Sequence, residues 1–293
     1  MSTKQEIDRV IATALLEDLG PVGDVTTLVT VSAEATGAAD IVAREAGVLS
    51  GCDAAQAAFR AVDPSTRVTW HVHDGGALAP GTQVATIEGA SRAILTGERT
   101  ALNLLGHLSG IATRTAGLVG LVEGTSARII DTRKTTPGLR SLEKDAVVHG
   151  GGANHRFGLY DAILVKDNHI ALGGGLHRVL ERLAERAGHL TPVEIEVDTL
   201  DQLQVVLAFD ADRIAAGQRP VVTAVLLDNM TPQLVAAGVE RVRTHPAPVV
   251  VEVSGGVTEA TVVALAKAGP DVISLGALTH SVRNLDLGLD HHG

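Results

Sequence analysis

The second half of the chain repeats one pattern, in which a short apolar run is followed by a longer amphipathic segment. The apolar runs lie at residues 127–130, 162–165, 193–197, 222–227, 249–253 and 271–275, and a helical segment follows each of the first five. Runs this short, bounded by polar turns, are typical of βα units whose strands pair in parallel. The pattern predicts an incomplete α/β barrel of about six parallel strands over residues 113–276.

The first 112 residues follow a different pattern and predict an N-terminal α/β sandwich domain. Apolar positions at helical spacing predict a helix over residues 3–18, and the turn-forming stretch GPVGDVTT ends it. Short strand-like runs follow at residues 38–51, 67–75 and 83–89, with a helical segment at 54–63. We expect residues 277–293, after the last apolar run, to pack against this first domain.

A long helical pattern joins the two predicted domains, from Ser91 to about Glu123. Gly97, Gly106 and Gly110 lie inside it. Glycine costs about 1 kcal/mol relative to alanine in a helix interior. The glycines therefore argue against one unbroken helix.

Composition narrows the classes of protein that this chain can belong to. It has 293 residues, a formal net charge of -10, 32 glycines and only 2% aromatic residues, so its core must consist of small aliphatic side chains. The negative charge disfavours a general nucleic-acid surface, which needs clustered positive charge. No stretch approaches the roughly 20 apolar residues of a membrane span and no signal-peptide core is present, so we expect a cytoplasmic protein. Cys52 is the only cysteine, which excludes an intrachain disulfide, and we interpret it as a packing residue.

Polar residues gather at the carboxyl ends of the predicted strands. In chain order they are Asp131, Arg133 and Lys134, then Lys166, Asp167 and Asn168, then Glu196 and Asp198, then Asp228 and Asn229, then Ser254, Gly255 and Gly256, and finally Gly276. In α/β barrels the carboxyl-terminal face of the strands is where active sites are built. The pattern predicts one polar site at this face.

Several of these residues are cationic, which an acidic chain does not require at a strand end. Arg133, Lys134 and Lys166 are joined by an Asn-His-Arg stretch that contains His155 and Arg156. Arginine matches a carboxylate or phosphate with two parallel hydrogen bonds, and lysine adds a compact charge. The set predicts a small polyanionic substrate. The alternative is a group of solvated ion pairs with Glu143, Asp145 or Asp167.

Two carboxylates and a glycine turn complete the predicted site. Glu196 and Asp228 could hold Mg2+ or ribose hydroxyls, or could only balance the cations. Ser254, Gly255 and Gly256 join a strand to a helix, where backbone amides can bind phosphate, although a plain tight turn is the simpler alternative. The stretch SLGALTH, at residues 274–280, is the expected neighbouring loop.

Other common site motifs are absent from the sequence. It holds no Walker A motif, no G-x-G-x-x-G motif and no His-Glu-x-x-His motif, which excludes the simple nucleotide-triphosphatase, dinucleotide-binding and zinc-protease classes. Of the 12 histidines only His155 lies within the cation-rich stretches, and we expect the others at the surface or in packing positions.

The segment DTRKTTPGLRSLEKDAVVHGGGANHRFGLYDAILVKDNHI, from Asp131 to Ile170, resembles the quinolinate phosphoribosyltransferase family, the nicotinate-nucleotide pyrophosphorylases (carboxylating) of NAD biosynthesis. Supporting stretches are EDLGPVGDVTT, GERTALNLLGHLSGIAT, VEIEVDTL, LLDN and VEVSGGV, in order along essentially the whole chain. One departure is visible, because residues 208–220 form a longer link than the family has between the strands of Glu196 and Asp228.

The resemblance implies an N-terminal α/β sandwich, an incomplete α/β barrel with phosphoribosyltransferase activity, and assembly at least as a homodimer. It implies decarboxylating phosphoribosyl transfer from phosphoribosyl pyrophosphate to quinolinate, with Mg2+ bound beside the phosphoribosyl pyrophosphate and no organic cofactor. By position it implies quinolinate ligands at Thr132, Arg133, His155, Arg156 and Lys166, together with Arg99 from the neighbouring subunit. It implies phosphoribosyl or phosphate ligands at Lys134, Ser254, Gly255, Gly256, Gly276 and Ala277. It also implies metal ligands at Glu196 and Asp228, and catalytic roles for Lys134, Lys166, Glu196 and Asp228.

Three other functions stay open on the sequence alone. A paralogue of the same fold, of the molybdenum-transport-associated type or a nicotinate phosphoribosyltransferase, would act on another substrate, but the intact stretches DTRKTTPG and KDNH disfavour both. A Schiff-base barrel aldolase could use Lys166, which also ends a predicted strand. A non-catalytic metabolite-binding protein is the third alternative.

Overall fold

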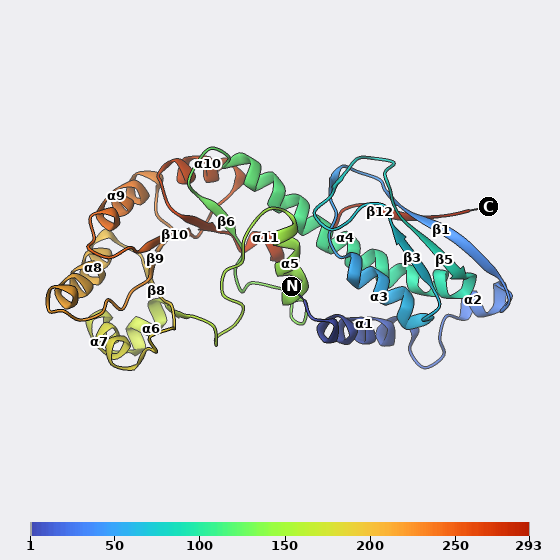
Figure 1. Ribbon diagram of the computed structural model, residues 1–293, viewed down its shortest axis with the longest axis horizontal. Helices are drawn as coiled ribbons and strands as arrows, with labels where there is room; N and C mark the ends of the chain where they lie inside the picture. Colours follow the sequence, from blue (N-terminus) through green and yellow to red (C-terminus); the bar gives the residue numbers. More distant parts are fainter. Residues whose placement is uncertain (1, 293) are drawn as a thin grey trace. The chain divides into compact units, whose positions relative to one another are not determined.

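The computed structural model describes residues 2–292, and the chain divides into two compact units (Figure 1). The first unit comprises Met1–Gly117, Lys134–Gly152 and Ala277–Gly293, and the second comprises Leu118–Arg133 and Ala153–Gly276. The chain therefore passes between the units several times. The segment that follows the first barrel strand belongs to the first unit.

The second unit is an incomplete α/β barrel, which confirms the fold predicted from the apolar runs. Its strands are β6 (Arg128–Ile130), β7 (Ile163–Val165), β8 (Val193–Val197), β9 (Ala224–Asp228), β10 (Val250–Ser254) and β11 (Val272–Ser274). All pairings are parallel, and the order across the sheet is β6-β11-β10-β9-β8-β7. A single parallel bridge between Ile130 and Ala153 continues the sheet beyond β6. Because strands of this sheet are covered on both faces, they appear in the sequence as continuous apolar runs.

Helices connect the barrel strands and lie outside the sheet (Figure 1). They are α6 (Asp167–Leu172) and α7 (Leu176–Arg186) after β7, α8 (Leu200–Ala215) after β8, α9 (Pro232–Arg243) after β9 and α10 (Glu259–Lys267) after β10. Thr199 and Thr231 begin α8 and α9 as N-caps whose side chains accept a backbone hydrogen bond. Residues 208–220 form the end of α8 and the link to β9. There the buried Asp210 carboxylate accepts hydrogen bonds from the amides of Val221 and Val222, each at 2.8 Å.

The first unit is built on an antiparallel sheet in the order β12-β1-β5-β3. Its strands are β1 (Thr36–Ala43), β3 (Arg67–Trp70), β5 (Gln83–Ala90) and β12 (Leu287–His291), and β2 (Gly47–Val48) pairs separately with β4 (Ala77–Leu78). Helices α1 (Lys4–Leu19) and α3 (Cys52–Val62) confirm the two predicted early helices. A short helix that was not predicted, α2 (Val25–Thr30), begins where Asp24 accepts a hydrogen bond from the Thr27 amide. Cys52 is buried, as predicted, and burial raises the pKa of its thiol.

Helix α4 (Ser91–Leu121) is continuous over 31 residues, so the expectation that its glycines interrupt it is wrong. Gly97, Gly106 and Gly110 each lie where another part of the first unit approaches the helix closely. A Cβ on Gly110 would overlap the carbonyl oxygen of Arg283, and one on Gly97 would come within 2.9 Å of the Phe59 ring. Close packing therefore explains the glycines, and it overrides their poor helix propensity. None of the helices within residues 2–292 is long and apolar enough to cross a membrane.

Candidate active site

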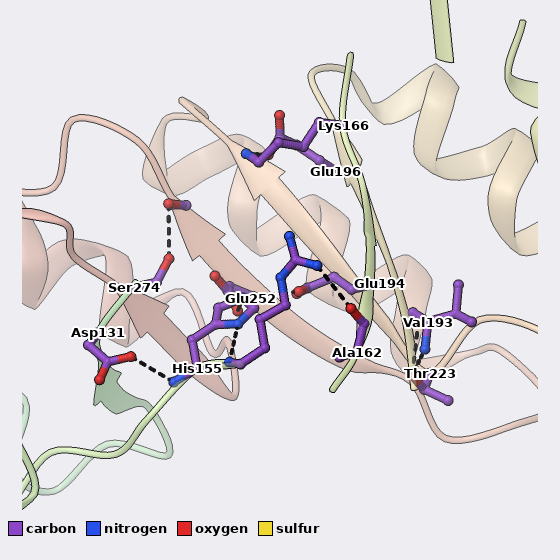
Figure 2. Close-up of polar contacts among 12 residues, drawn as sticks. Asp131, His155, Ala162, Lys166, Val193, Glu194, Glu196, Thr223, Glu252 and Ser274 are labelled. Carbon is purple, nitrogen blue, oxygen red and sulfur yellow. Dashed lines mark hydrogen bonds and ion pairs between the residues drawn. The ribbon is translucent and has the colours of Figure 1, made fainter. Parts of the chain in front are cut away.

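The carboxyl ends of β7 and β8 bring a cation and an anion together. Lys166 comes directly after β7, Glu196 lies near the end of β8, and the Lys166 ammonium forms an ion pair with the Glu196 carboxylate (Figure 2). Glu196 is buried, whereas Lys166 is exposed. In this state Glu196 balances a cation, which is one of the roles that the sequence left open for it.

At the ends of β9 and β10, the Asn229 side chain and the turn at Gly255 lie directly against the Asp228 carboxylate. This residue ends β9 opposite Ser254 of β10, and the side-chain amide of Asn229 donates a hydrogen bond to its carboxylate at 2.5 Å. Gly255 and Gly256 follow with φ values of 83° and 60°. A Cβ on Gly255 would lie 2.8 Å from a carboxylate oxygen of Asp228 and closer still to the Asn229 amide. Glycine is required here because the turn passes directly against the Asp228 side chain.

Strand β11, the sixth predicted strand, is joined to the end of β10 by a hydrogen bond between two serine hydroxyls. The Ser274 hydroxyl, at the end of β11, donates a hydrogen bond to the Ser254 hydroxyl at 2.9 Å. Gly276 follows two residues later in the chain. The structure thus brings together the ends of β9, β10 and β11, as the sequence predicted for its polar ring.

Two arginines of the barrel unit act on each other through their charges. Thr132 and Arg133 follow β6, and Arg156 donates a hydrogen bond from Nη1 to the Ala162 carbonyl at 2.9 Å. The Nε atoms of Arg133 and Arg156 are both buried and, within residues 2–292, have no hydrogen-bond partner. Burial lowers the pKa of Arg156, and the positive charge of Arg133 lowers it further. Buried guanidinium donors without a partner are groups that an anion can satisfy.

Two buried carboxylates inside the barrel approach His155, and the sequence reasoning missed both. His155 Nε2 lies 3.2 Å from Glu194 Oε2 of β8 and 3.5 Å from Glu252 Oε2 of β10 (Figure 2). The signal was a glutamate within each of the apolar runs VEIEV and VVVEV, because a charge inside a buried strand needs a partner. The ligand atoms of these three residues lie within 4.8 Å of one another, which is close enough to hold a metal ion.

The backbone around His155 fixes the orientation of its ring. The Arg156 amide donates a hydrogen bond to His155 Nδ1 at 2.6 Å, and the His155 amide donates to the buried Asp131 carboxylate at 2.9 Å. Because Nδ1 accepts this hydrogen bond, the ring N–H group that remains to donate is that of Nε2. The ring therefore directs its N–H group toward the two glutamates.

The remaining predicted site residues belong to the first unit. Arg99 lies on α4 with 66% of its side chain exposed, and Glu98 is 4.0 Å away. Lys134 begins the segment that leads into α5 (Arg140–His149). Ala277 begins the short helix α11 (Ala277–His280), in which the Thr279 hydroxyl donates a hydrogen bond to the Lys134 carbonyl at 2.8 Å.

A fully buried glutamate supports the segment that carries Lys134. Glu143 of α5 accepts a hydrogen bond from the Thr136 amide at 3.0 Å, and its other oxygen lies 2.8 Å from His107 Nε2 on α4. The sequence considered Glu143 only as a solvated partner of the cations. Its place in the structure is instead a buried anchor for the backbone two residues after Lys134.

The fold defines an α/β-barrel protein, and charged and polar residues gather at the carboxyl ends of its strands. The chain belongs to the quinolinate phosphoribosyltransferase family, because the family's C-terminal domain matches residues 111–290 and its N-terminal domain matches residues 24–109. The resemblance inferred from the sequence motifs is confirmed.

Similar proteins cover nearly the whole chain. The nicotinate-nucleotide pyrophosphorylase [carboxylating] of Mycobacterium leprae is 43% identical over 282 residues, which are 96% of this chain and 95% of that protein. The probable nicotinate-nucleotide pyrophosphorylase [carboxylating] of Bacillus subtilis is 40% identical over 275 residues, or 94% and 90% of the two chains. The crystal structure of the nicotinate-nucleotide pyrophosphorylase from Ehrlichia chaffeensis superposes with a TM-score of 0.89 at 35% identity, covering 99% of both chains.

A human nicotinic acid phosphoribosyltransferase structure is more distant. The superposition covers 100% of this chain and 74% of the human chain, with a TM-score of 0.64 and 14% sequence identity. Similarity at that level extends to the fold alone.

Proposed function

We propose that this protein transfers a phosphoribosyl group from phosphoribosyl pyrophosphate to quinolinate with loss of CO2, giving nicotinate mononucleotide and pyrophosphate. The observation that carries the proposal is the pair of Arg133 and Arg156, whose buried Nε donors are unsatisfied within residues 2–292. With Lys166 they offer more positive charge than one carboxylate needs, which suits the dianion quinolinate. Membership of the family supports the same reaction. We expect the enzyme in the cytoplasm.

The reaction requires positioning and charge stabilisation rather than a protein nucleophile. The quinolinate ring nitrogen forms a bond to ribose C1 while the bond from C1 to pyrophosphate breaks. The ring is then cationic and accepts the electron pair left at C2 when CO2 departs, and a proton takes that place. In our proposal the quinolinate pocket consists of Thr132, Arg133, His155, Arg156 and Lys166. The phosphates are held by Lys134, Ser254, Gly255, Gly256, Gly276 and Ala277.

The test is product analysis by mass after mixing the protein with quinolinate, phosphoribosyl pyrophosphate and Mg2+. Nicotinate, which lacks the 2-carboxylate, is the matched control substrate. It should not react, because buried cations left unpaired cost on the order of 1–3 kcal/mol each. Comparable turnover of nicotinate would refute the assignment. Borohydride trapping of a carbonyl substrate on Lys166 would instead favour the aldolase alternative.

We infer that Mg2+ binds with phosphoribosyl pyrophosphate at Glu196 and Asp228, and that no organic cofactor takes part. Carboxylate oxygens are the ligands that Mg2+ prefers, and the ion usually completes its shell with substrate phosphates and water. The two residues fit this role, since they lie on the adjacent strands β8 and β9 near their carboxyl ends. The Glu196 ion pair with Lys166 must then rearrange as the substrates bind.

A substitution at one carboxylate tests this inference. Asp228→Asn should weaken the binding of phosphoribosyl pyrophosphate with Mg2+ far more than the binding of quinolinate, as measured by calorimetry. Equal loss of both would mean that the carboxylates only balance the cations.

We propose that the enzyme is a homodimer in which Arg99 reaches quinolinate bound by the neighbouring subunit. Within the first unit, Arg99 lies three residues after Thr96, and this spacing places both on one face of α4. Thr96 donates a hydrogen bond to Asp24 at 3.1 Å, at the start of α2, so Arg99 projects on the side where α2 packs. Around α2 the exposed large apolar residues are Leu16, Val22, Val25, Leu28 and Val29. Several exposed apolar residues within and near α2 in the chain, together with an exposed arginine on α4, support a subunit interface.

Subunit mixing tests the dimer. Arg99→Ala and Lys166→Ala homodimers should each be nearly inactive, since every site lacks one cation. Random re-pairing should restore up to about a quarter of wild-type activity, because half of the dimers are then mixed and each has one intact site. If exchange is verified by mass and no activity returns, Arg99 does not act across subunits.

A further inference from the structure

One histidine N–H group in the barrel interior lies between two buried carboxylates. Glu194 and Glu252 are only 8% and 3% exposed, and both approach Nε2 of His155, at 3.2 and 3.5 Å. The other ring nitrogen, Nδ1, accepts the hydrogen bond from the Arg156 amide, so Nε2 is the only ring nitrogen left to face the carboxylates. One histidine ring offers a single N–H group and at most one positive charge here, so it cannot compensate two buried negative charges. The arrangement therefore requires that one of the carboxyl groups keep its proton.

The surroundings of Glu252 identify it as the protonated member. Three groups face it, namely Glu194 from β8, His155 from the segment before β7, and the Ser274 hydroxyl from β11, which donates to Ser254. Its Oε1 atom is buried and, among residues 2–292, has no hydrogen-bond partner. A carboxylate oxygen without a donor is strongly disfavoured in the interior, whereas a neutral acid is not. Burial, and then the charge of Glu194, raise the pKa of Glu252 to about 8.

We propose that Glu252 works as a neutral carboxylic acid, so that the barrel interior presents one negative charge, that of Glu194, to the arginine pair. Glu194 already acts electrostatically on Arg156. A second negative charge beside it would offset the positive charge of Arg133 and Arg156 and weaken the binding of a dianion. Glu252 is thus a positioning residue, which sets the charge available to the substrate and holds the His155 ring without contacting substrate itself. Only the identity of the dianion, quinolinate, rests on the proposed function.

The protonation state can be measured on the ligand-free protein. Infrared difference spectra of the wild type against Glu252→Gln should contain the carbonyl band of a protonated carboxylic acid at pH 6, and the band should disappear as the pH rises through about 8. Absence of this band at pH 6 would overturn the proposal. So would a stoichiometric metal ion in the purified protein that is lost in Glu252→Gln, since His155, Glu194 and Glu252 are close enough to share one.

The functional consequence is measured by titrating quinolinate into the protein by calorimetry at several pH values. The wild-type Kd should rise by roughly tenfold as Glu252 ionises, whereas Glu252→Gln, which mimics the neutral acid, should show a flat profile over the same range. Glu88→Gln, an exposed glutamate paired with Arg67, is the matched control and should follow the wild type. Parallel profiles for the wild type and Glu252→Gln would overturn the proposal. If quinolinate fails to bind at any pH, the proposed function fails, and the infrared experiment still decides the state of Glu252.

Discussion

The glycines of α4 allow the same substitution to be tested at two positions with opposite expected outcomes. Gly110 packs against the segment before β12. An alanine Cβ there would lie 3.0 Å from Val282 Cγ1 and 3.2 Å from the carbonyl carbon of Arg283, and closer still to the carbonyl oxygen. Gly117 lies two turns further along the same helix, and a Cβ there would meet nothing within 4 Å. The pair separates helix propensity from packing.

Propensity favours alanine at both positions by about 0.8–1 kcal/mol. At Gly117 this is the only contribution, so Gly117→Ala should stabilise the protein by roughly 0.5–1 kcal/mol. At Gly110 the new methyl group meets backbone, which cannot rotate away as a side chain can, and overpacking of this kind typically costs about 1–3 kcal/mol or more. Gly110→Ala should therefore be less stable than Gly117→Ala by roughly 1–3 kcal/mol, because the propensity gain is the same at both positions.

Urea unfolding followed by circular dichroism measures both variants against the wild type. The helical signal of the folded proteins should be unchanged, because α4 remains a helix in each case. Equal stabilisation of the two variants would refute the explanation that the segment before β12 packs directly against Gly110 of α4. The expected loss should appear in the denaturation midpoint, with no change in the slope of the transition.

Three other expectations concern buried groups and the segment of Lys134. Asp210→Ala should lower the free energy of unfolding by roughly 2–5 kcal/mol, because the amides of Val221 and Val222 lose their acceptor. Asp210→Asn should lower it less, because its side-chain oxygen can still accept a hydrogen bond. Equal losses for the two variants in urea unfolding would contradict the role of these hydrogen bonds. Between pH 4.5 and about 8, Glu252 releases its proton in the unfolded wild type but keeps it in the folded wild type, so the wild type loses stability as the pH rises. Glu252→Gln should therefore become more stable than the wild type across this window, by up to roughly 5 kcal/mol. A stability difference that is constant with pH in guanidinium titrations would refute the linkage. Glu143→Ala should raise the KM for phosphoribosyl pyrophosphate more than that for quinolinate, since it releases the Thr136 amide near Lys134; equal changes in steady-state kinetics would argue against a local effect.

The barrel was accessible from sequence because its strands are short, buried and separated by polar turns. The run at residues 193–197 coincides with β8, and the other predicted strands differ from the observed ones by one or two residues at their ends. Strand β12 was not predicted, because its partner β1 lies more than 200 residues earlier and the pairing leaves no local periodicity. The continuity of α4 was missed for a similar reason, since the contacts that explain its glycines come from distant segments.

The site was predicted at the strand ends but not in the barrel interior. Lys166 with Glu196, and Asp228 with Ser254, come together because parallel strands end at one edge. Glu194 and Glu252 lie earlier in their strands, among apolar neighbours. A search for charged residues within the runs, rather than after them, would have found both. Their relation to His155 depends on how β8 and β10 are placed across the sheet, which no local pattern encodes.

The position of β12 has a consequence for how the protein is made. This strand pairs with β1 along one side of the antiparallel sheet, yet a ribosome synthesises it after every other strand of that sheet and after all six barrel strands. The sheet that begins earliest in the chain is therefore completed last, and until then β1 presents an open edge to other chains. A truncation after His280 would leave that edge permanently uncovered, so aggregation during expression is the failure expected of such a shortened protein.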